Sequence, residues 1–136
     1  MNIPDSAIEI TCYFTWMGED GIARTKVKTA AEVNLEFAKE NSVAVNSLSK
    51  KGEKFPLIVD ARGIKSMTRD ARNQFSTRGR KTFVTSFAII IDSPLSRVIG
   101  NFFMGINKPA VPTRLFESEE KAKEWLLNLN LTSEIK

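Results

Sequence analysis

The chain has 136 residues, 42% of them apolar, and a formal net charge of +4, which suits one globular domain with an ordinary core. It contains no histidine and one cysteine, Cys12. Histidine-based nucleophile systems, zinc sites built from histidine or several thiolates, and an internal disulfide are therefore excluded.

Two absences predict where the protein resides. The longest unbroken apolar run, Phe87 to Ile91, is far shorter than the roughly 20 residues that a membrane-spanning helix needs. The first ten residues lack a basic stretch followed by an apolar one, so no secretory signal is visible. We expect a cytoplasmic protein, in which Cys12 packs as a small hydrophobic residue rather than acting as a reactive thiol.

The N-terminal part predicts a hairpin. Residues Ala7 to Met17 alternate apolar and polar, which indicates a half-exposed strand. The residues assigned to its polar, solvent-facing side are Glu9, Thr11, Tyr13 and Thr15. The turn residues Gly18 to Gly21 and the weakly apolar stretch Ile22 to Lys28 then predict an antiparallel partner strand near an edge of the sheet. Because hairpin edges are open to pairing, an exposed Trp16 beside the turn could form a homodimer contact.

The next segment predicts a helix and a central strand. Thr29-Ala-Ala-Glu32 has the form of a capping box, and apolar residues at helical spacing follow it toward Ser49. After the charged loop 50–54, the apolar run Phe55 to Val59 is typical of a strand buried on both faces.

A polar loop and a second helical pattern follow the central strand. Thr68 suits the N-cap of this helix, Ala71 and Phe75 have i, i+4 spacing, and Gly79 lies near its end. Loops after the carboxyl ends of parallel strands commonly hold ligand or partner sites. We therefore expect function to reside in the segment from Phe55 to Phe75.

The rest of the chain predicts two strands and two helices. Phe83 to Ile91 lacks polar alternation in its second half and should be the most buried strand. Ser93 suits the N-cap of a helix and Pro94 suits its first position. The residues after them form a wide apolar stripe. The stripe comprises Leu95, Val98, Ile99, Phe102, Phe103 and Ile106.

The last elements are an edge strand and a final helix. Val111, Thr113 and Leu115 alternate in a strand that nearby prolines confine to an edge. Ser118 caps the helix, and the tail from Thr132 is expected to be loose. The order ββαβαβαβα predicts one α/β domain over residues 1–131, with a mixed sheet of about five strands, an N-terminal antiparallel hairpin, four helices and a tail at 132–136.

Several stretches carry a family resemblance. They are Val59-Asp-Ala-Arg-Gly-Ile-Lys-Ser66, Ser93-Pro-Leu-Ser-Arg-Val-Ile-Gly-Asn-Phe-Phe103, Lys108-Pro109, Pro112-Thr-Arg-Leu-Phe116 and Glu120-Lys-Ala-Lys-Glu-Trp-Leu126. They resemble small bacterial STAS-like domains, whose fold is that of anti-sigma-factor antagonists. The resemblance implies a non-enzymatic regulatory module that binds another protein through the loop and helix after the central strand.

In such antagonists a serine in a D-S-[ST]-G loop is the phosphorylated switch. The corresponding loop here, Ser66-Met-Thr-Arg-Asp70, lacks that motif and places Thr68 or Arg69 at the serine position. Thr68 could still accept a phosphate that the helix amides and Arg69 and Arg72 would hold. The simpler interpretation makes Thr68 a helix cap and Ser66 a turn residue.

Positive charge is concentrated in the same segment. From Arg62 to Lys81 seven basic residues accompany only Asp70, a net charge of +6, so the rest of the chain carries about −2. Such a surface attracts acidic partners, whereas nucleic acid is disfavoured because Phe75 and Phe83 look like core residues. The predicted partner-binding residues are Asp60, Arg62, Ser66, Thr68, Arg69 and Arg72.

Two alternatives stay open. A binding module for a lipidic or anionic small ligand could use a pocket lined by Phe102, Phe103 and Met104, since some STAS-like relatives are thought to hold lipids. An enzyme or metal site could instead use Asp60 and Asp92 at adjacent strand ends, although pairing of Asp60 with Arg62 is the favoured role. No nucleotide-binding or nucleophile motif occurs, so neither an enzyme nor a cofactor is predicted.

Overall fold

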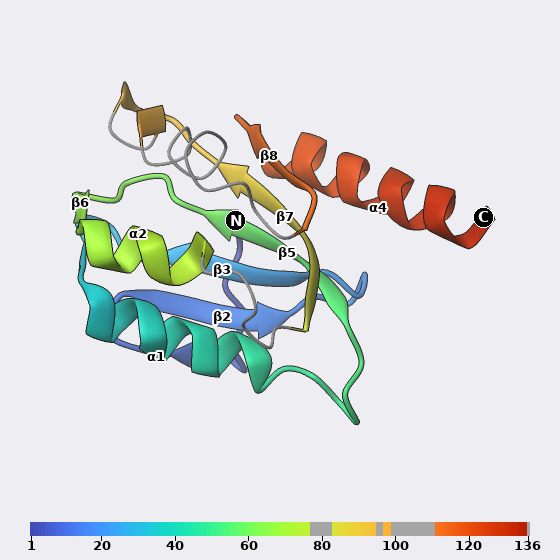
Figure 1. The fold of residues 1–136 in the computed structure, drawn as a ribbon, viewed down its shortest axis with the longest axis horizontal. Helices are drawn as coiled ribbons and strands as arrows, with labels where there is room; N and C mark the ends of the chain where they lie inside the picture. Colours follow the sequence, from blue (N-terminus) through green and yellow to red (C-terminus); the bar gives the residue numbers. More distant parts are fainter. Residues whose placement is uncertain (77–82, 95–96, 99–110, 136) are drawn as a thin grey trace.

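The structure is a computed structural model, and it describes residues 1–76, 83–94, 97–98 and 111–135. Its centre is a six-stranded mixed sheet (Figure 1). In spatial order the strands are β1 (Ile8–Glu9), β2 (Tyr13–Met17), β3 (Ala23–Val27), β5 (Phe55–Asp60), β7 (Val84–Ile90) and β8 (Thr113–Phe116). The first three are antiparallel neighbours, and β3, β5, β7 and β8 are parallel to one another.

Helices cover both faces of the sheet. Helix α1 (Leu35–Asn46) and helix α2 (Arg69–Ser76) lie side by side on one face (Figure 1). Helix α4 (Glu119–Ile135) covers the other face, where Ala122 and Leu126 pack with Ile58 of β5. In the described residues, no helix is both long and apolar enough to cross a membrane.

A second, two-stranded sheet joins the starts of α1 and α2. Strand β4 (Glu32–Val33) pairs in parallel with strand β6 (Ser66–Met67). Each short strand immediately precedes a helix cap, Asn34 for α1 and Thr68 for α2. The two helices therefore begin next to each other at one end of the molecule (Figure 1).

The predicted first strand is in fact a hairpin. The backbone turns back after Glu9, with Ile10 N donating to the carbonyl of Tyr13 at 2.9 Å, so β1 pairs with β2. This extra strand raises the main sheet from about five strands to six. Alternation alone could not detect the turn because apolar residues continue in phase on both sides of it.

Two further predictions about the hairpin were wrong. Tyr13 and Thr15, assigned to a solvent face, are buried, as is Trp16, so Trp16 offers no exposed dimer contact. Strand β3 lies between β2 and β5 rather than at an edge. The reason is that helices cover both faces of the sheet, so polar alternation here does not mark exposure. Cys12 is buried as predicted, and burial raises the pKa of its thiol.

The capping-box prediction was also wrong. Helix α1 starts at Leu35, and the side chain of Asn34 caps it by accepting a hydrogen bond from Phe37 N at 2.9 Å. Residues 29–33 instead form a turn and strand β4, with Ala30 in the left-handed region at φ 62°. The pairing of β4 with β6 satisfies backbone groups that the longer helix would have used.

Most other predicted elements are confirmed. The central strand, strand β7, the last strand, helix α2 and the final helix occur where expected, and Lys121 N donates to the Ser118 cap at 3.3 Å. Strand β7 is not the most buried strand, however, because Thr85 is exposed whereas no residue of β5 is. Three helices are described over their full length rather than four. Of the helix expected after Ser93, Pro94, Arg97 and Val98 are helical, and Arg97 N donates to the Ser93 carbonyl at 2.9 Å; most of its apolar stripe, at 95–96 and 99–106, lies outside the described residues. Helix α4 runs through Ile135, beyond the predicted boundary at residue 131.

Candidate docking surface at the start of helix α2

Asp60 ends strand β5 and is completely buried. Its Oδ1 accepts hydrogen bonds from Arg62 Nε at 2.9 Å and from Arg62 N at 3.1 Å, and its Oδ2 accepts one from the guanidinium at 2.7 Å. The carboxylate thus meets both the side chain and the backbone of one residue. The favoured prediction, a structural pair between Asp60 and Arg62, is confirmed.

Lys26 on the neighbouring strand β3 completes this group. Its Nζ lies 3.8 Å from Asp60 Oδ2 and donates to the carbonyl of Arg62 at 3.0 Å. Burial by itself raises the pKa of Asp60, but the hydrogen bonds from Arg62 and the charges of Lys26 and Arg62 outweigh it, so this pKa is lowered. The hydrogen bonds to Asp60 in turn raise the pKa of Arg62.

The loop after Asp60 is held by a neighbouring loop. Ala30 N donates to the carbonyl of Gly63 at 2.8 Å, and both residues have positive φ. Lys65 N and Ser66 N both donate to the carbonyl of Ala31, at 2.9 and 3.2 Å. Thr68 N donates to the carbonyl of Val33 at 2.9 Å. The loop before α2 is therefore hydrogen-bonded along its length to the loop before α1.

Thr68 is the N-cap of helix α2. Its Oγ1 accepts a hydrogen bond from Ala71 N at 3.2 Å, and its carbonyl accepts the first helical bond from Arg72 N at 3.0 Å. The residue is exposed, as are Ser66 and Arg69 beside it. The predicted capping role is confirmed, and the hydroxyl oxygen acts there as an acceptor.

The basic residues at this end have different surroundings. Arg69 is exposed and forms no ion pair with any residue that the structure describes. Lys65 Nζ lies 3.8 Å from Glu32 Oε1, with both side chains exposed. Arg72 NH1 donates to the carbonyl of Met67 at 3.0 Å. Arg78, Arg80 and Lys81, which supply the rest of the predicted charge, lie outside the described residues.

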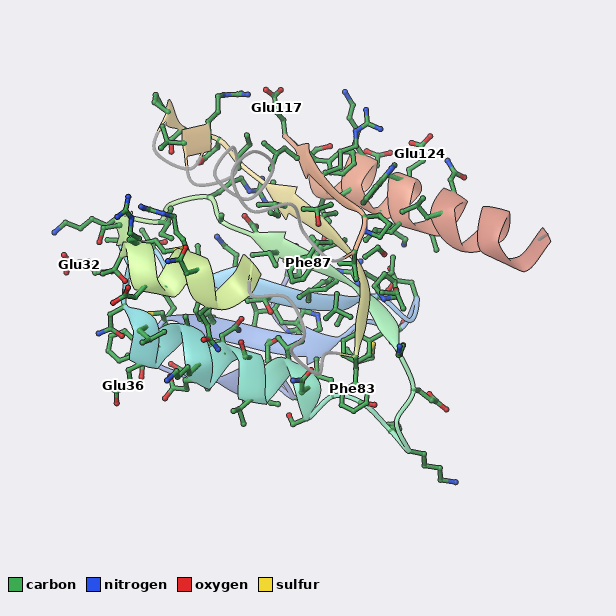
Figure 2. The ribbon with its side chains drawn as sticks, viewed as in Figure 1. Glu32, Glu36, Phe83, Phe87, Glu117 and Glu124 are labelled. Carbon is green, nitrogen blue, oxygen red and sulfur yellow. The ribbon has the colours of Figure 1, made fainter. Side chains whose placement is uncertain are left out.

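Sequence reasoning missed the half of this surface that comes from the loop before α1. Glu32, Asn34 and Glu36 are exposed, and Figure 2 shows Glu32 and Glu36 at the end where the two helices begin. Their proximity to Ser66 and Thr68 follows from the pairing of β4 with β6. Two-residue strands leave no periodic signal in a sequence, so no pattern pointed to them.

The remaining predicted site residues are Asp60 and Asp92, which the structure describes, and the three pocket residues, which it does not. Asp60 is too buried to touch a partner directly and instead holds Arg62, whose side chain is 32% exposed. Asp92 follows strand β7, and its charge contributes to the raised pKa of Arg62. Among the described residues no group of three or more acidic or thiol side chains could hold a metal. The predicted pocket residues Phe102, Phe103 and Met104 lie outside those residues.

Comparisons with known proteins place the chain in a fold and a family. Residues 15–130 match a family model described as a domain of unknown function, DUF7793. The chain is similar to a solved structure from Shewanella loihica PV-4, an uncharacterised protein of the DUF3478 family with a SpoIIAA-like fold. The TM-score is 0.55 and the identity 16%, and the match covers 84% of this chain and 91% of that chain. No curated protein sequence matches. The predicted STAS-like fold is confirmed.

Proposed function

We propose that this chain, which belongs to the DUF7793 family, is a non-enzymatic interaction module that docks a regulatory protein at the start of helix α2. The observation that carries the proposal is the setting of Thr68. It is an exposed hydroxyl at a helix N-terminus, next to the exposed Arg69, on a loop held by hydrogen bonds. Exposed side chains on a fixed backbone are favourable for binding because little ordering entropy is lost.

The proposed docking surface comprises selected exposed residues of the two loops and of the first turns of α1 and α2. They are Glu32, Asn34, Glu36, Lys65, Ser66, Thr68 and Arg69, with Arg62 and Arg72 at the margin and Asp60 beneath. The α1 side of the surface carries Glu32 and Glu36, and the α2 side carries Lys65 and Arg69 next to the exposed Asp70. A partner that fits would present basic side chains to Glu32 and Glu36, and acidic ones to Lys65 and Arg69.

Thr68 is also the proposed phospho-acceptor, with Ser66 as the alternative. In the cap, the Thr68 hydroxyl oxygen accepts a hydrogen bond from Ala71 N. Its proton takes no part in that bond and would be replaced by a phosphoryl group on phosphorylation. A phosphate at this position would meet the first-turn amides of α2 and the Arg69 guanidinium. Added negative charge next to Glu32 and Asn34 would alter the surface that the partner contacts.

Other parts of the proposal come from the sequence alone. They are a cytoplasmic location, a single domain and the absence of catalysis, and the resemblance to small bacterial domains adds a bacterial source. The alternative of a lipidic ligand relied on Phe102, Phe103 and Met104, which lie outside the described residues, whereas an anionic ligand would use the basic run that begins at Arg62. A homodimer likewise has no support from Trp16, which is buried.

The test is affinity capture from the native cell with charge-matched baits. Wild type, Arg69→Glu and Lys121→Glu would each be immobilised, and the retained proteins compared by quantitative mass spectrometry. Lys121 is an exposed basic residue on α4, on the opposite face of the sheet, so its reversal changes net charge equally. We expect one protein that wild type and Lys121→Glu retain and that Arg69→Glu loses at least tenfold, about 1.4 kcal/mol.

Identical retention by all three baits would reject the docking site. Intact-mass and peptide analysis of the same native protein tests the modification separately. A mass increase that maps to Thr68 or Ser66 supports phosphorylation, and an unmodified loop under every growth condition rejects it.

A further inference from the structure

A layer of polar side chains crosses the core beneath helix α1. Thr15 of β2 and Thr25 of β3 are cross-strand partners, and neither has any exposed area. The Thr15 hydroxyl donates to the carbonyl of Arg24 at 2.8 Å, and the two threonine oxygens are 2.8 Å apart. Since a hydroxyl has a single proton, Thr25 must donate to Thr15. Lone pairs on the Thr25 oxygen are then left to accept another hydrogen bond.

Asn41 is the polar residue on the buried side of α1. It is only 4% exposed, and it lies among the buried helix residues Ala38, Ala44 and Val45. Its Nδ2 is buried and has no hydrogen-bond partner in the described part of the chain. A buried amide nitrogen without an acceptor is unfavourable, because transfer from water removes hydrogen bonds that nothing replaces.

The apolar clusters on either side indicate that Asn41 lies level with the two threonines. Toward one end of the layer, Tyr13, Val27 and Ala38 belong to one apolar cluster. Toward the other end, Ala23 and Val45 belong to a second. Thr25 lies between Ala23 and Val27 on β3, just as Asn41 lies between Ala38 and Val45 on α1. Strand β3 rises about 13 Å from Ala23 to Val27, and helix α1 rises about 10 Å from Ala38 to Val45. The two spans are similar in length, so their middle residues fall at the same level.

We propose that a buried water molecule occupies this layer and bridges α1 to the sheet. The water accepts a hydrogen bond from Asn41 Nδ2 and donates one to Thr25 Oγ1. Several neighbouring buried positions on α1 and β3 are alanines, namely Ala38, Ala44 and Ala23, whose short side chains favour room for an ordered water. Buried waters typically satisfy polar groups of this kind that lack a protein partner.

The bridge would also set the position of α1 along the sheet. A shift of the helix by one turn would carry the Asn41 amide from the threonines to one of the apolar clusters. There it would find no acceptor, so the polar layer favours one register. That register is the one in which the Asn34 cap of α1 lies beside the Thr68 cap of α2.

A high-resolution crystal structure of the wild-type protein tests the proposal. We expect a solvent peak within hydrogen-bonding distance of both Asn41 Nδ2 and Thr25 Oγ1. Direct donation from the Asn41 amide to a protein oxygen would overturn the proposal, and so would an amide packed against carbon with no density beside it.

Two variants and a control sharpen the test. Thr25→Val removes the acceptor but keeps the side-chain shape, and Asn41→Leu removes the donor; either should abolish the solvent peak. Ser42→Ala is the control, because that hydroxyl donates to the Ala38 carbonyl of its own helix, and the peak should persist. A peak that survives Thr25→Val and Asn41→Leu contradicts the bridge. Should Asn41→Leu fail to fold, the wild-type and Thr25→Val structures still decide.

Discussion

Asp60 and Arg62, which are separated by one residue, form a bidentate ion pair. The guanidinium of Arg62 donates to Oδ1 at 2.9 Å and to Oδ2 at 2.7 Å, while the Arg62 amide donates to Oδ1 at 3.1 Å. Asp60 is completely buried and the Arg62 side chain reaches solvent. The pair therefore fixes Arg62, the second residue of the loop that leads to the proposed docking surface.

Asp60→Asn should destabilise the protein by about 3 kcal/mol, because it leaves Lys26 and Arg62 without their buried counter-charge. The amide has nearly the same shape, so the loss reports charge and hydrogen bonding rather than packing. Urea unfolding followed by circular dichroism measures the change. Asp5→Asn, at an exposed position, is the matched control and should leave stability unchanged. Equal stability of the two variants would show that the ion pair contributes little.

Stability should fall in acid because of two lowered carboxyl pKa values. The Arg24 hydrogen bonds lower the pKa of Asp20, and at Asp60 the Arg62 hydrogen bonds outweigh the raising effect of burial. A carboxyl with a lowered folded-state pKa stabilises the fold above its unfolded value of about 4, and this contribution is lost as the pH falls through the folded value. Urea midpoints from pH 7 to pH 2 should decline below about pH 4.

The same titration should be flatter in Asp60→Asn, which lacks one of the two groups. Parallel curves for the variant and the wild type would mean that Asp60 does not contribute to the acid sensitivity.

Gly18→Ala should cost about 2 kcal/mol, because the new methyl group would overlap the Arg24 guanidinium, Asp20 Oδ1 and the Ile22 carbonyl. Arg24 binds Asp20 at 2.8 Å and Glu119 at 3.0 Å, so its displacement would also loosen the start of α4. Thermal unfolding measures the loss.

The matched control is Gly21→Ala in the same turn. Gly21 has φ +80°, and a methyl group there meets nothing within 4 Å, so the cost is backbone strain alone, about 1 kcal/mol. A larger loss for Gly21→Ala than for Gly18→Ala would contradict the crowding around Arg24.

Lys51→Gly should stabilise the protein by about 0.5 kcal/mol. Lys51 has φ 54° in an exposed turn next to Gly52, a conformation that costs a residue with a side chain more than it costs glycine. Lys50→Gly, one position earlier and outside the left-handed region, should instead destabilise by a similar amount. Differential scanning calorimetry of both variants checks the signs, and a loss of stability in Lys51→Gly would refute the strain.

Thr68→Ala should cost about 1 kcal/mol through loss of the α2 cap, whereas Thr68→Ser should retain most of the stability because its hydroxyl can accept the same bond from Ala71 N. Ser66→Ala should be neutral, since Ser66 is exposed and pairs through its backbone. Hydrogen exchange of the α2 amides locates the effect. Unchanged protection in Thr68→Ala would argue that the cap is unimportant.

The elements that sequence reasoning located correctly are those with a strong local cause. The apolar runs of β5 and β7 mark buried strands. Thr68 caps α2 and Ser118 caps α4. The link between Asp60 and Arg62 was also foreseen, because a carboxylate and a guanidinium two residues apart can meet without help from the rest of the chain.

The errors concern features that depend on distant residues. Glu32 and Val33 leave the expected helix because Ser66 and Met67 offer them backbone partners. Thr15 is buried because α1 packs over it, although its polarity predicted exposure. Neither Lys26 nor Glu36 belonged to a recognisable sequence pattern. Lys26 nevertheless reaches Asp60 from another strand, and Glu36 lies at the end of the molecule where α2 begins.

By itself, the sequence determined the α/β class, the STAS-like resemblance, the main strands and helices, and the segment where function is proposed. These follow from apolar periodicity and capping, which act over a few residues. Only the tertiary structure decided that the loops before α1 and α2 pair with each other, that Asp60 is buried, and that Thr15, Thr25 and Asn41 are buried in the core. Those features arise from backbone pairing and burial between segments far apart in the chain, whose free energy no local pattern records.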